Sequence, residues 1–581
     1  MSVLLLTAPD EALPFDAYLD EVLRSEGWCL HEHRPATGAV GGDELAQYAL
    51  VIISRGAARQ LAPAEVESYL RAGGRVVCIR PPREWGPGLG LQPRLAETYA
   101  TLRDGYLRVR DDHPWLGSFP TLDLQLHGEA DVYEDGEFEA LAWLAGQRGH
   151  ETPFPAVAAA RIGEGIAVTF AFDLAECIVL HHQGRIASAS TGPDPDANRD
   201  GKFTADDLFE GMRDFELRHV PQADVLQELL TRAITGLTGD LLPLPRLWRF
   251  PDAAPALLLL DGDGDSMCPE DMRAAAEICE RHGGRFTFFL MDEEIRDFDA
   301  DELRAMAARG HGIGPHPRVP LRPSVAEWRS EVTRITADLH ALGFEPVSLR
   351  MHSCIMPGWD EAPRTLAELG LGLETSFLQG YRFQSGYLNG SALPARFIDR
   401  DGNLLDCWEQ STVLGDDTLV TTKTMMPVKS EQQCIDLSLE LMRELAGRWH
   451  GVFHPYFHPI NVGGHGRMHT ARWLDEVLRE GVRLGMPAPS CDAWLAFTQA
   501  RHAARMEDAR WDADTRELRL RLAGQRAAEG LTVILPRMGT DAPVQAEVAG
   551  APRDLTDVAG ERAICLDLPA GGELSIRVSY A

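Results

Sequence analysis

The chain has 581 residues, of which 44% are hydrophobic and 25% charged, and its formal net charge at pH 7 is −32. A chain of this length can bury several cores and is too long for one ordinary domain, and its acidic balance repels the phosphate backbone of nucleic acid. No stretch approaches the roughly 18 uninterrupted apolar residues of a membrane span. The ten cysteines stand singly, without a Cys-x-x-Cys pair, which is typical of reduced thiols. We therefore expect a cytoplasmic protein of several domains that binds neither nucleic acid nor membrane, although loss of a leader peptide would leave export open, and the sequence leaves the oligomeric state undetermined.

The first part of the chain alternates short apolar runs with helical periods up to about residue 85. SVLLLTA, YALVIISRG and RVVCIRP are typical of strands, and FDAYLDEVLRSEG and APAEVESYLRAGG are typical of amphipathic helices. This alternation predicts a parallel sheet covered by helices. From about 100 to 185 the pattern becomes more β-like, and Gly163-Glu164-Gly165 predicts a hairpin turn.

We assign residues 1–240 to one α/β domain with an insertion. Its pattern resembles flavodoxin-like and glutamine-amidotransferase-like domains. An amidotransferase of that class needs a cysteine on a tight turn from strand to helix, but Cys78 is followed by Ile-Arg-Pro-Pro. We therefore do not expect this domain to catalyse that chemistry.

Residues 241–505 form the second predicted domain, which begins in the proline-rich linker LLPLPRLWRFPDAAP. Strand-like and helix-like segments then alternate about seven times. Such a series predicts an irregular (β/α)7-type barrel, whose active site would lie at the carboxyl ends of the strands. Residues 506–581 alternate with period two in RELRLRLAG, GLTVILP and ELSIRVSYA, and we expect a small β-sandwich there.

Polar side chains follow several of the predicted strands in residues 241–505. They are Asp261, Asp263, Asp265, His316, Arg350, His352, His454 and His458. Each has a simpler interpretation: the Asp-Gly-Asp-Gly-Asp run is compatible with a solvated turn, and a single histidine is more often structural than a ligand. Their joint position at one rim favours a metal or acid–base site, because carboxylate oxygen and imidazole nitrogen together suit zinc or another divalent transition metal.

The segments LLLLDGDGD, GHGIGPH, Arg350-Met-His352 and GVFHPYFHP resemble the motifs of the polysaccharide deacetylase family, also called the NodB homology domain. The string GYLNGSALPARFIDRDGNLLDCWEQST is similar to a bacterial offshoot of this family that carries an amidotransferase-like domain in front. The resemblance implies a metal-dependent hydrolase that removes N-acetyl or related amide-linked acyl groups from a carbohydrate. A divalent metal would lower the pKa of a water molecule for attack on the amide carbonyl.

The motifs depart from the family pattern, so the roles must be redistributed. Pro320 stands where a second metal histidine is usual, glycines separate the aspartates, and His352 replaces the proline of the Arg-x-Pro motif. We expect Asp263, His316 and His352 to hold the metal, with His458 and Asp265 as further candidates. Asp261 would be the general base, Arg350 would keep it ionised, and His454 would protonate the leaving amine.

Aromatic residues in the predicted loops are candidates for stacking on sugar rings, with ordinary packing as an equal alternative. They are Trp359, Tyr381, Tyr387 and Trp408.

A second candidate metal site is a calcium loop in the first domain. Its ligands would be Asp196, Asn198, Asp200, the carbonyl of Lys202, Thr204 and Asp207, with Gly201 at the sharp turn. The alternative is a plain acidic turn.

Two other functions fit the same sequence. The protein would be a catalytically inactive carbohydrate-binding or scaffold protein if Pro320 and the interposed glycines have abolished metal binding. It would hydrolyse a small amide or cyclic imide if the barrel has kept its chemistry and changed its substrate.

Overall fold

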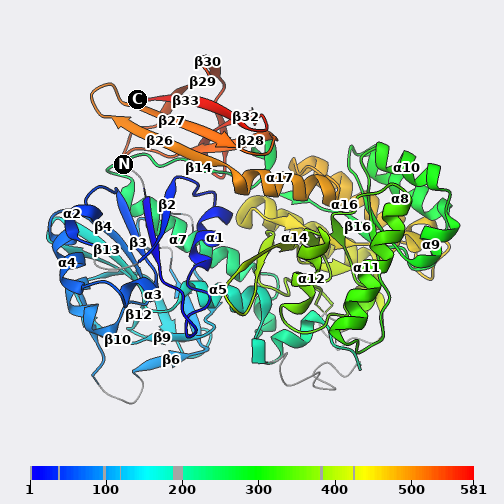
Figure 1. The fold of residues 1–581 in the computed structure, drawn as a ribbon, viewed down its shortest axis with the longest axis horizontal. Helices are drawn as coiled ribbons and strands as arrows, with labels where there is room; N and C mark the ends of the chain where they lie inside the picture. Colours follow the sequence, from blue (N-terminus) through cyan, green and yellow to red (C-terminus); the bar gives the residue numbers. More distant parts are fainter. Residues whose placement is uncertain are drawn as a thin grey trace. The chain divides into compact units, whose positions relative to one another are not determined.

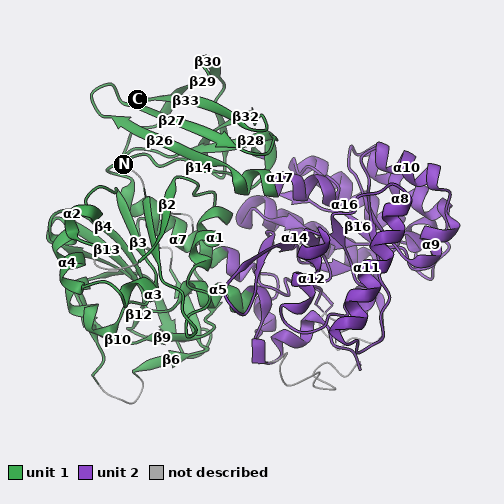
Figure 2. Cartoon of the chain, in the orientation of Figure 1, with its two compact units in different colours: residues 1–181, 225–253, 499–581 green, residues 182–224, 254–498 purple. Residues whose placement is uncertain are grey.

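The computed structural model describes residues 3–36, 40–95, 100–110, 112–117, 119–187, 201–379, 384–422 and 426–581 (Figure 1). The chain is a mixed α/β protein with a large sheet, and it divides into two compact units (Figure 2). Unit 1 comprises residues 1–181, 225–253 and 499–581, and unit 2 comprises residues 182–224 and 254–498. The three-domain division drawn from the sequence stays a prediction. None of the helices in the described ranges has the length and apolar character of a membrane span.

Unit 1 contains a nine-stranded sheet with a parallel half and an antiparallel half. The parallel strands lie in the order β2 (His31–Pro35), β1 (Val3–Thr7), β3 (Leu50–Ile53), β4 (Arg75–Ile79) and β13 (Gly165–Phe170). The antiparallel half continues with β12 (Pro155–Ile162), β11 (Glu139–Ala145), β7 (Tyr106–Val109) and β8 (Leu122–Gln125). The amphipathic segments form α1 (Tyr18–Ser25) and α4 (Pro63–Arg71). The predicted parallel sheet and the hairpin between β12 and β13 are therefore confirmed.

Cys78 lies inside β4 and is fully buried. The residue that follows the strand, Arg80, has a φ of 38°, in the left-handed region that a side chain rarely adopts. The thiol is thus not at the turn where an amidotransferase nucleophile would stand, as expected.

The C-terminal strands of unit 1 form two antiparallel sheets. One has the order β26 (Arg505–Asp512), β27 (Glu517–Gly524), β33 (Gly572–Tyr580), β29 (Pro543–Val548) and β30 (Ala551–Arg553). The other has the order β14 (Arg246–Leu247), β28 (Ala528–Leu535), β32 (Glu561–Leu568) and β31 (Thr556–Val558). The strands predicted from period-two alternation are confirmed, and part of the proline-rich linker adds β14 to the second sheet.

Unit 2 is built on short parallel strands. One sheet has the order β18 (Gly312–Pro315), β17 (Thr287–Leu290), β16 (Asp261–Asp263), β25 (Pro455–Tyr456) and β23 (Leu414–Gly415). A second sheet joins β19 (Ser348–Leu349), β20 (Leu373–Glu374), β22 (Leu404–Glu409) and β21 (Ala395–Ile398), of which only β21 is antiparallel. A short parallel pair, β15 (Leu257–Leu258) and β24 (Val452–Phe453), precedes β16 and β25 along the chain.

Backbone hydrogen bonds join the two main sheets of unit 2 through β18 and the start of the segment after β19, and through the segments after β20 and before β23. The Arg350 N–H donates to the Pro315 carbonyl (3.4 Å), and the Thr412 N–H donates to the Phe377 carbonyl (2.9 Å). The carboxyl ends of β16, β18 and β19 therefore meet around one centre, which places their following side chains close together.

The helices of unit 2 alternate with its strands as the apolar period predicts. They include α8 (Pro269–Arg281), α10 (Ala300–Ala308), α11 (Val325–Ala341), α12 (Glu361–Leu369), α14 (Glu431–Glu444) and α16 (Ala471–Leu484). Helix α11 begins at a capping box in which Ser324 and Glu327 satisfy each other's backbone N–H groups. The core between helices and strands contains Phe286, Phe288 and Trp473, all nearly inaccessible to solvent.

Candidate functional site

Three aspartates of unit 2 lie at increasing distance from the core. Asp261, Asp263 and Asp265 are spaced by two, so their side chains share one face of the extended segment that begins with β16. The Asp261 side chain is fully buried, that of Asp263 is 11% exposed, and that of Asp265 is 31% exposed. Each carboxylate therefore meets a different set of partners.

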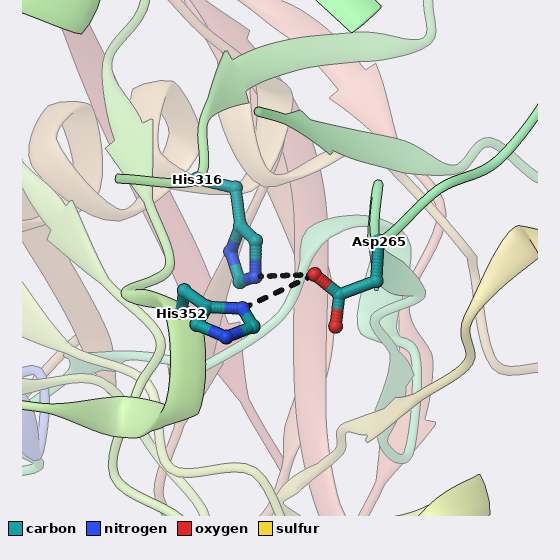
Figure 3. Close-up of side chains that lie close together, drawn as sticks. All are labelled: Asp265, His316 and His352. Carbon is teal, nitrogen blue, oxygen red and sulfur yellow. Dashed lines mark hydrogen bonds and ion pairs between the residues drawn. The ribbon is translucent and has the colours of Figure 1, made fainter. Parts of the chain in front are cut away.

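Asp265, His316 and His352 form a group whose ligand atoms all lie within 4.8 Å of one another (Figure 3). Asp265 Oδ1 lies 3.7 Å from His316 Nε2 and 3.1 Å from His352 Nδ1. The histidines come from the segments that follow β18 and β19, and their rings stand nearly perpendicular, at 81°. Two imidazole nitrogens and one carboxylate oxygen are a donor set for a catalytic divalent metal. The expected triad included Asp263 in place of Asp265.

His316 has the protonation pattern of a metal ligand. Its Nδ1 lies 2.8 Å from the Arg350 carbonyl and donates to it, which leaves Nε2 unprotonated. Nε2 is buried and has no hydrogen-bond partner among the described residues. Burial lowers the pKa of His316 to about 3, so the ring is neutral. A buried acceptor aimed at two carboxylates fits a cation between them.

Asp263 lies between the metal-ligand group and Arg350. Its Oδ2 is 3.7 Å from His316 Nε2, and its Oδ1 is 3.2 Å from Arg350 Nε, close enough for an ion pair but without the alignment of a hydrogen bond. Burial raises the pKa of Asp263 to about 8, and Arg350 opposes that rise. The carboxyl thus lies beside the metal-ligand group, and Oδ1 accepts no hydrogen bond from any residue in the described ranges.

Asp261 and His454, expected to act as base and acid, pair with each other and with internal partners. Both Asp261 oxygens accept from Arg350 Nη2, at 2.7 and 2.8 Å, and Oδ2 lies 2.9 Å from His454 Nε2. Burial alone would raise the pKa of Asp261, but Arg350 and His454 lower it below its usual value. The other nitrogen of His454 lies 3.2 Å from the Gln410 carbonyl. Neither residue lines the cavity described below, and both contact partners inside unit 2.

His458, unlike His454, lines the cavity described below. Its Nδ1 lies 2.7 Å from Asp416 Oδ1, and its backbone N–H donates to Asp416 Oδ2 at 3.0 Å. Asn461 Nδ2 donates to the same Oδ2 at 2.9 Å. Burial opposes the charged imidazole, but Asp416 raises the pKa of His458 well above its ordinary value. Nε2 is left facing Asp265 Oδ2 at 3.6 Å.

A cavity of about 90 Å³ opens beside these groups. Its lining includes Asp263, Asp265, His352, His458, Lys202, Thr204, Asp417 and Tyr456. The sequence did not single out Asp417 or Tyr456, whose hydroxyl donates to Asp417. Tyr456 stands inside the HPYFHP segment between the two histidines, and this position was the available signal.

The described aromatic residues expected to stack on sugars are packed inside unit 2. Trp359, Tyr387 and Trp408 are at most 4% exposed, and the Trp359 indole N–H donates to the Gly184 carbonyl. Tyr381 lies outside the described residues. The alternative of ordinary packing therefore holds for the three described rings.

The candidate calcium loop is described only in its second half. Asp196, Asn198 and Asp200 lie outside the described residues. Lys202 and Thr204 line the cavity of unit 2, and Asp207 Oδ2 accepts from the Thr204 N–H at 2.7 Å as a helix cap. The calcium site stays a prediction.

No protein-family model matches the chain, and no curated protein does. Among solved structures, the Xyl-CE4 domain of a multidomain xylanase from the hindgut metagenome of Trinervitermes trinervoides is 12% identical over 42% of this chain and 92% of its own, with a TM-score of 0.27. A peptidoglycan deacetylase from Bacillus subtilis is 14% identical over 42% and 91%, with a TM-score of 0.26. A CE4 family pseudoenzyme from Bacillus anthracis is 12% identical over 41% and 65%, also with a TM-score of 0.26.

The similarity to polysaccharide deacetylases that the motifs indicated is thus found among solved structures over about 42% of the chain. The amidotransferase-like character of the N-terminal part stays a prediction.

Proposed function

We propose that the chain is a metal-dependent hydrolase that removes an amide-linked acyl group, such as acetyl, from a carbohydrate. The observation that carries this proposal is the arrangement of metal-ligand and acid–base side chains around one cavity. Asp265, His316 and His352 supply three metal donors, Asp263 lies beside them, and His458 faces the same space. A catalytic metal site needs three protein ligands and an open position, with an acid and a base in reach. The joined parallel strands support the irregular barrel expected from the sequence.

The metal would be held by Asp265 Oδ1, His316 Nε2 and a nitrogen of His352. Zinc or another divalent transition metal fits two nitrogens and one oxygen. Such an ion supplies Lewis-acid polarisation of the amide carbonyl and lowers the pKa of water. The hydrogen bond from His316 Nδ1 to the Arg350 carbonyl fixes the orientation of that ring.

Asp263 is the proposed general base in place of Asp261. A divalent cation bound beside it would favour its ionised form and so oppose the rise in pKa that burial causes. The Asp263 carboxylate borders both the cavity and His316 Nε2, so a water molecule placed there lies within reach of Asp263 Oδ2. Arg350 lies on its far side and holds both aspartates through one guanidinium. Arg350 therefore positions the base and does not touch substrate.

His458 is the proposed general acid in place of His454. Asp416 holds Nδ1 and favours the imidazolium, while Nε2 faces the cavity, where a leaving amine would need a proton. A histidine oriented by a buried carboxylate on its other nitrogen is the arrangement that proton transfer requires.

Asp263, Asp265, His352 and His458 all border the cavity, so an acyl group that enters it would meet the metal-ligand group, the base and the acid together. The motif resemblance favours an amino sugar over a small amide or cyclic imide as the source of that acyl group.

Acetate release and metal content test the proposal together. Purified protein loaded with zinc is expected to release acetate from N-acetylglucosamine oligomers and to lose that activity, along with one equivalent of zinc, in His316→Ala. The exposed His340→Ala, on α11, serves as the matched control and should retain both. Equal zinc content in the two variants would refute the metal site, and hydrolysis confined to small amides or imides would refute the substrate. Binding of oligomers without hydrolysis would support the inactive binder.

A further inference from the structure

A second group of metal-ligand side chains lies elsewhere in unit 2. Cys268 precedes α8, Asp271 lies in its first turn, and His465 follows α15 (Pro459–Gly463). Cys268 Sγ is 3.6 Å from His465 Nδ1 and 3.1 Å from Asp271 Oδ2, and His465 Nδ1 is 2.6 Å from Asp271 Oδ1. The three ligand atoms that would serve a metal lie within 4.8 Å of one another.

The spacing of these donors fits tetrahedral zinc. With Zn–S of about 2.3 Å and Zn–N of about 2.0 Å, a tetrahedral angle separates sulfur from nitrogen by about 3.5 Å. The observed separation of 3.6 Å agrees with that edge. Asp271 and His465, now in hydrogen-bond contact, would need to separate by less than about 1 Å to take their places. The His465 side chain is 59% exposed, so the fourth position is open to water.

Helix capping accounts for only part of this arrangement. Asp271 Oδ2 accepts from the Cys268 N–H at 3.0 Å, which completes the cap. Asp271 Oδ1 instead contacts His465, which lies 194 residues later in the chain. The chain permits this approach only because residue 463 is glycine: a Cβ there would lie 1.9 Å from Asp271 Oδ1. The local backbone thus accommodates the contact between the two segments.

We propose that Cys268, Asp271 and His465 bind a second zinc ion, separate from the catalytic metal, with water as its fourth ligand. Binding would release the thiol proton of Cys268 to water and form the sulfur–zinc bond. Cys268 lies three residues after Asp265, and His465 lies seven residues after His458. The ion therefore joins the two loops that carry a catalytic metal ligand and the proposed acid, and it holds both in position.

Cobalt(II) distinguishes the two sites because, of the two proposed sets of ligands, Cys268, Asp271 and His465 include a sulfur and Asp265, His316 and His352 do not. Metal-free full-length protein titrated with cobalt(II) is expected to bind two equivalents per chain and to develop a near-ultraviolet sulfur-to-cobalt charge-transfer band as the site that contains Cys268 fills. Cys268→Ser should lose the band and about half of the bound zinc while keeping the helix cap, because serine also caps. His465→Ala, an exposed position that should fold normally, should do the same. Cys565→Ser, at a partly exposed cysteine of unit 1, should keep the band.

The outcomes separate this proposal from the proposed function. His316→Ala should lose hydrolysis and one zinc but keep the charge-transfer band. Absence of the band in the native protein, or its persistence in Cys268→Ser, overturns the second zinc site. Persistence of the band in a protein without hydrolytic activity overturns only the proposed function.

Discussion

The most specific prediction concerns which histidine, His454 or His458, acts as the general acid. His458→Ala should remove the proton donor to the leaving amine, because Nε2 of this residue faces the cavity. His454→Ala should leave that donor in place, because both of its nitrogens lie beside internal acceptors, Asp261 and the Gln410 carbonyl.

The expected size of the effect follows from the chemistry of amide cleavage. A positioned general acid contributes about 10²- to 10⁴-fold in rate, or about 3 to 5 kcal/mol of transition-state stabilisation. An amine is a poor leaving group without a proton, whereas 4-nitrophenolate leaves unprotonated. The loss in His458→Ala should therefore be large for an N-acetyl sugar and small for 4-nitrophenyl acetate.

The assay is a comparison of kcat for the two substrates in both variants, at matched zinc content. His454→Ala should lower the stability of the fold by about 1–3 kcal/mol, because it leaves a buried acceptor unsatisfied, and should change both substrates alike. If His454→Ala shows the selective loss of amide cleavage and His458→Ala does not, the assignment drawn from the cavity is refuted.

Three further predictions concern stability and metal. Arg350→Met should lower the free energy of unfolding by about 3–5 kcal/mol in a denaturant titration, because it leaves Asp261 charged and buried, whereas Arg329→Met, at an exposed ion pair, should cost less than about 1 kcal/mol. Burial raises the pKa of Asp492, which accepts from Ser348, to about 6, so the folded form loses stability as pH rises from about 4 to about 6. The free energy of unfolding of Asp492→Asn, relative to that of the native protein, should therefore rise by about 2 kcal/mol between about pH 4.5 and about pH 7.5. An equal difference between the two proteins at both pH values would contradict this. Removal of metal by a chelator should abolish acetate release, and zinc should restore it; activity that survives complete removal would exclude a metal-dependent reaction.

Local pattern was sufficient to find the secondary structure of unit 2. The apolar run before Leu290 predicted β17, and the helical period after Ser324 predicted α11, because burial of one face imposes that spacing on the residues. The alternation of predicted strands and helices also indicated that polar side chains follow Asp263, Pro315 and Leu349, where β16, β18 and β19 end.

The sequence could not assign individual roles to the polar residues of the site. Asp261, Asp263 and Asp265 are equivalent in spacing, and His454 and His458 stand in the same His-Pro context. Their roles depend on depth and on partners far along the chain, which no local pattern encodes.

What the sequence determined by itself is the order of strands and helices and the kinds of donor atoms at one rim, because these follow from hydrophobic period and residue chemistry. Only the tertiary structure decided which donors share a centre. Asp416, 42 residues before His458, orients that ring, and the Arg350 carbonyl, 34 residues after His316, fixes the tautomer that leaves a nitrogen free for a metal. Protonation and ligation depend on the atoms that surround a group, and folding alone brings those atoms together.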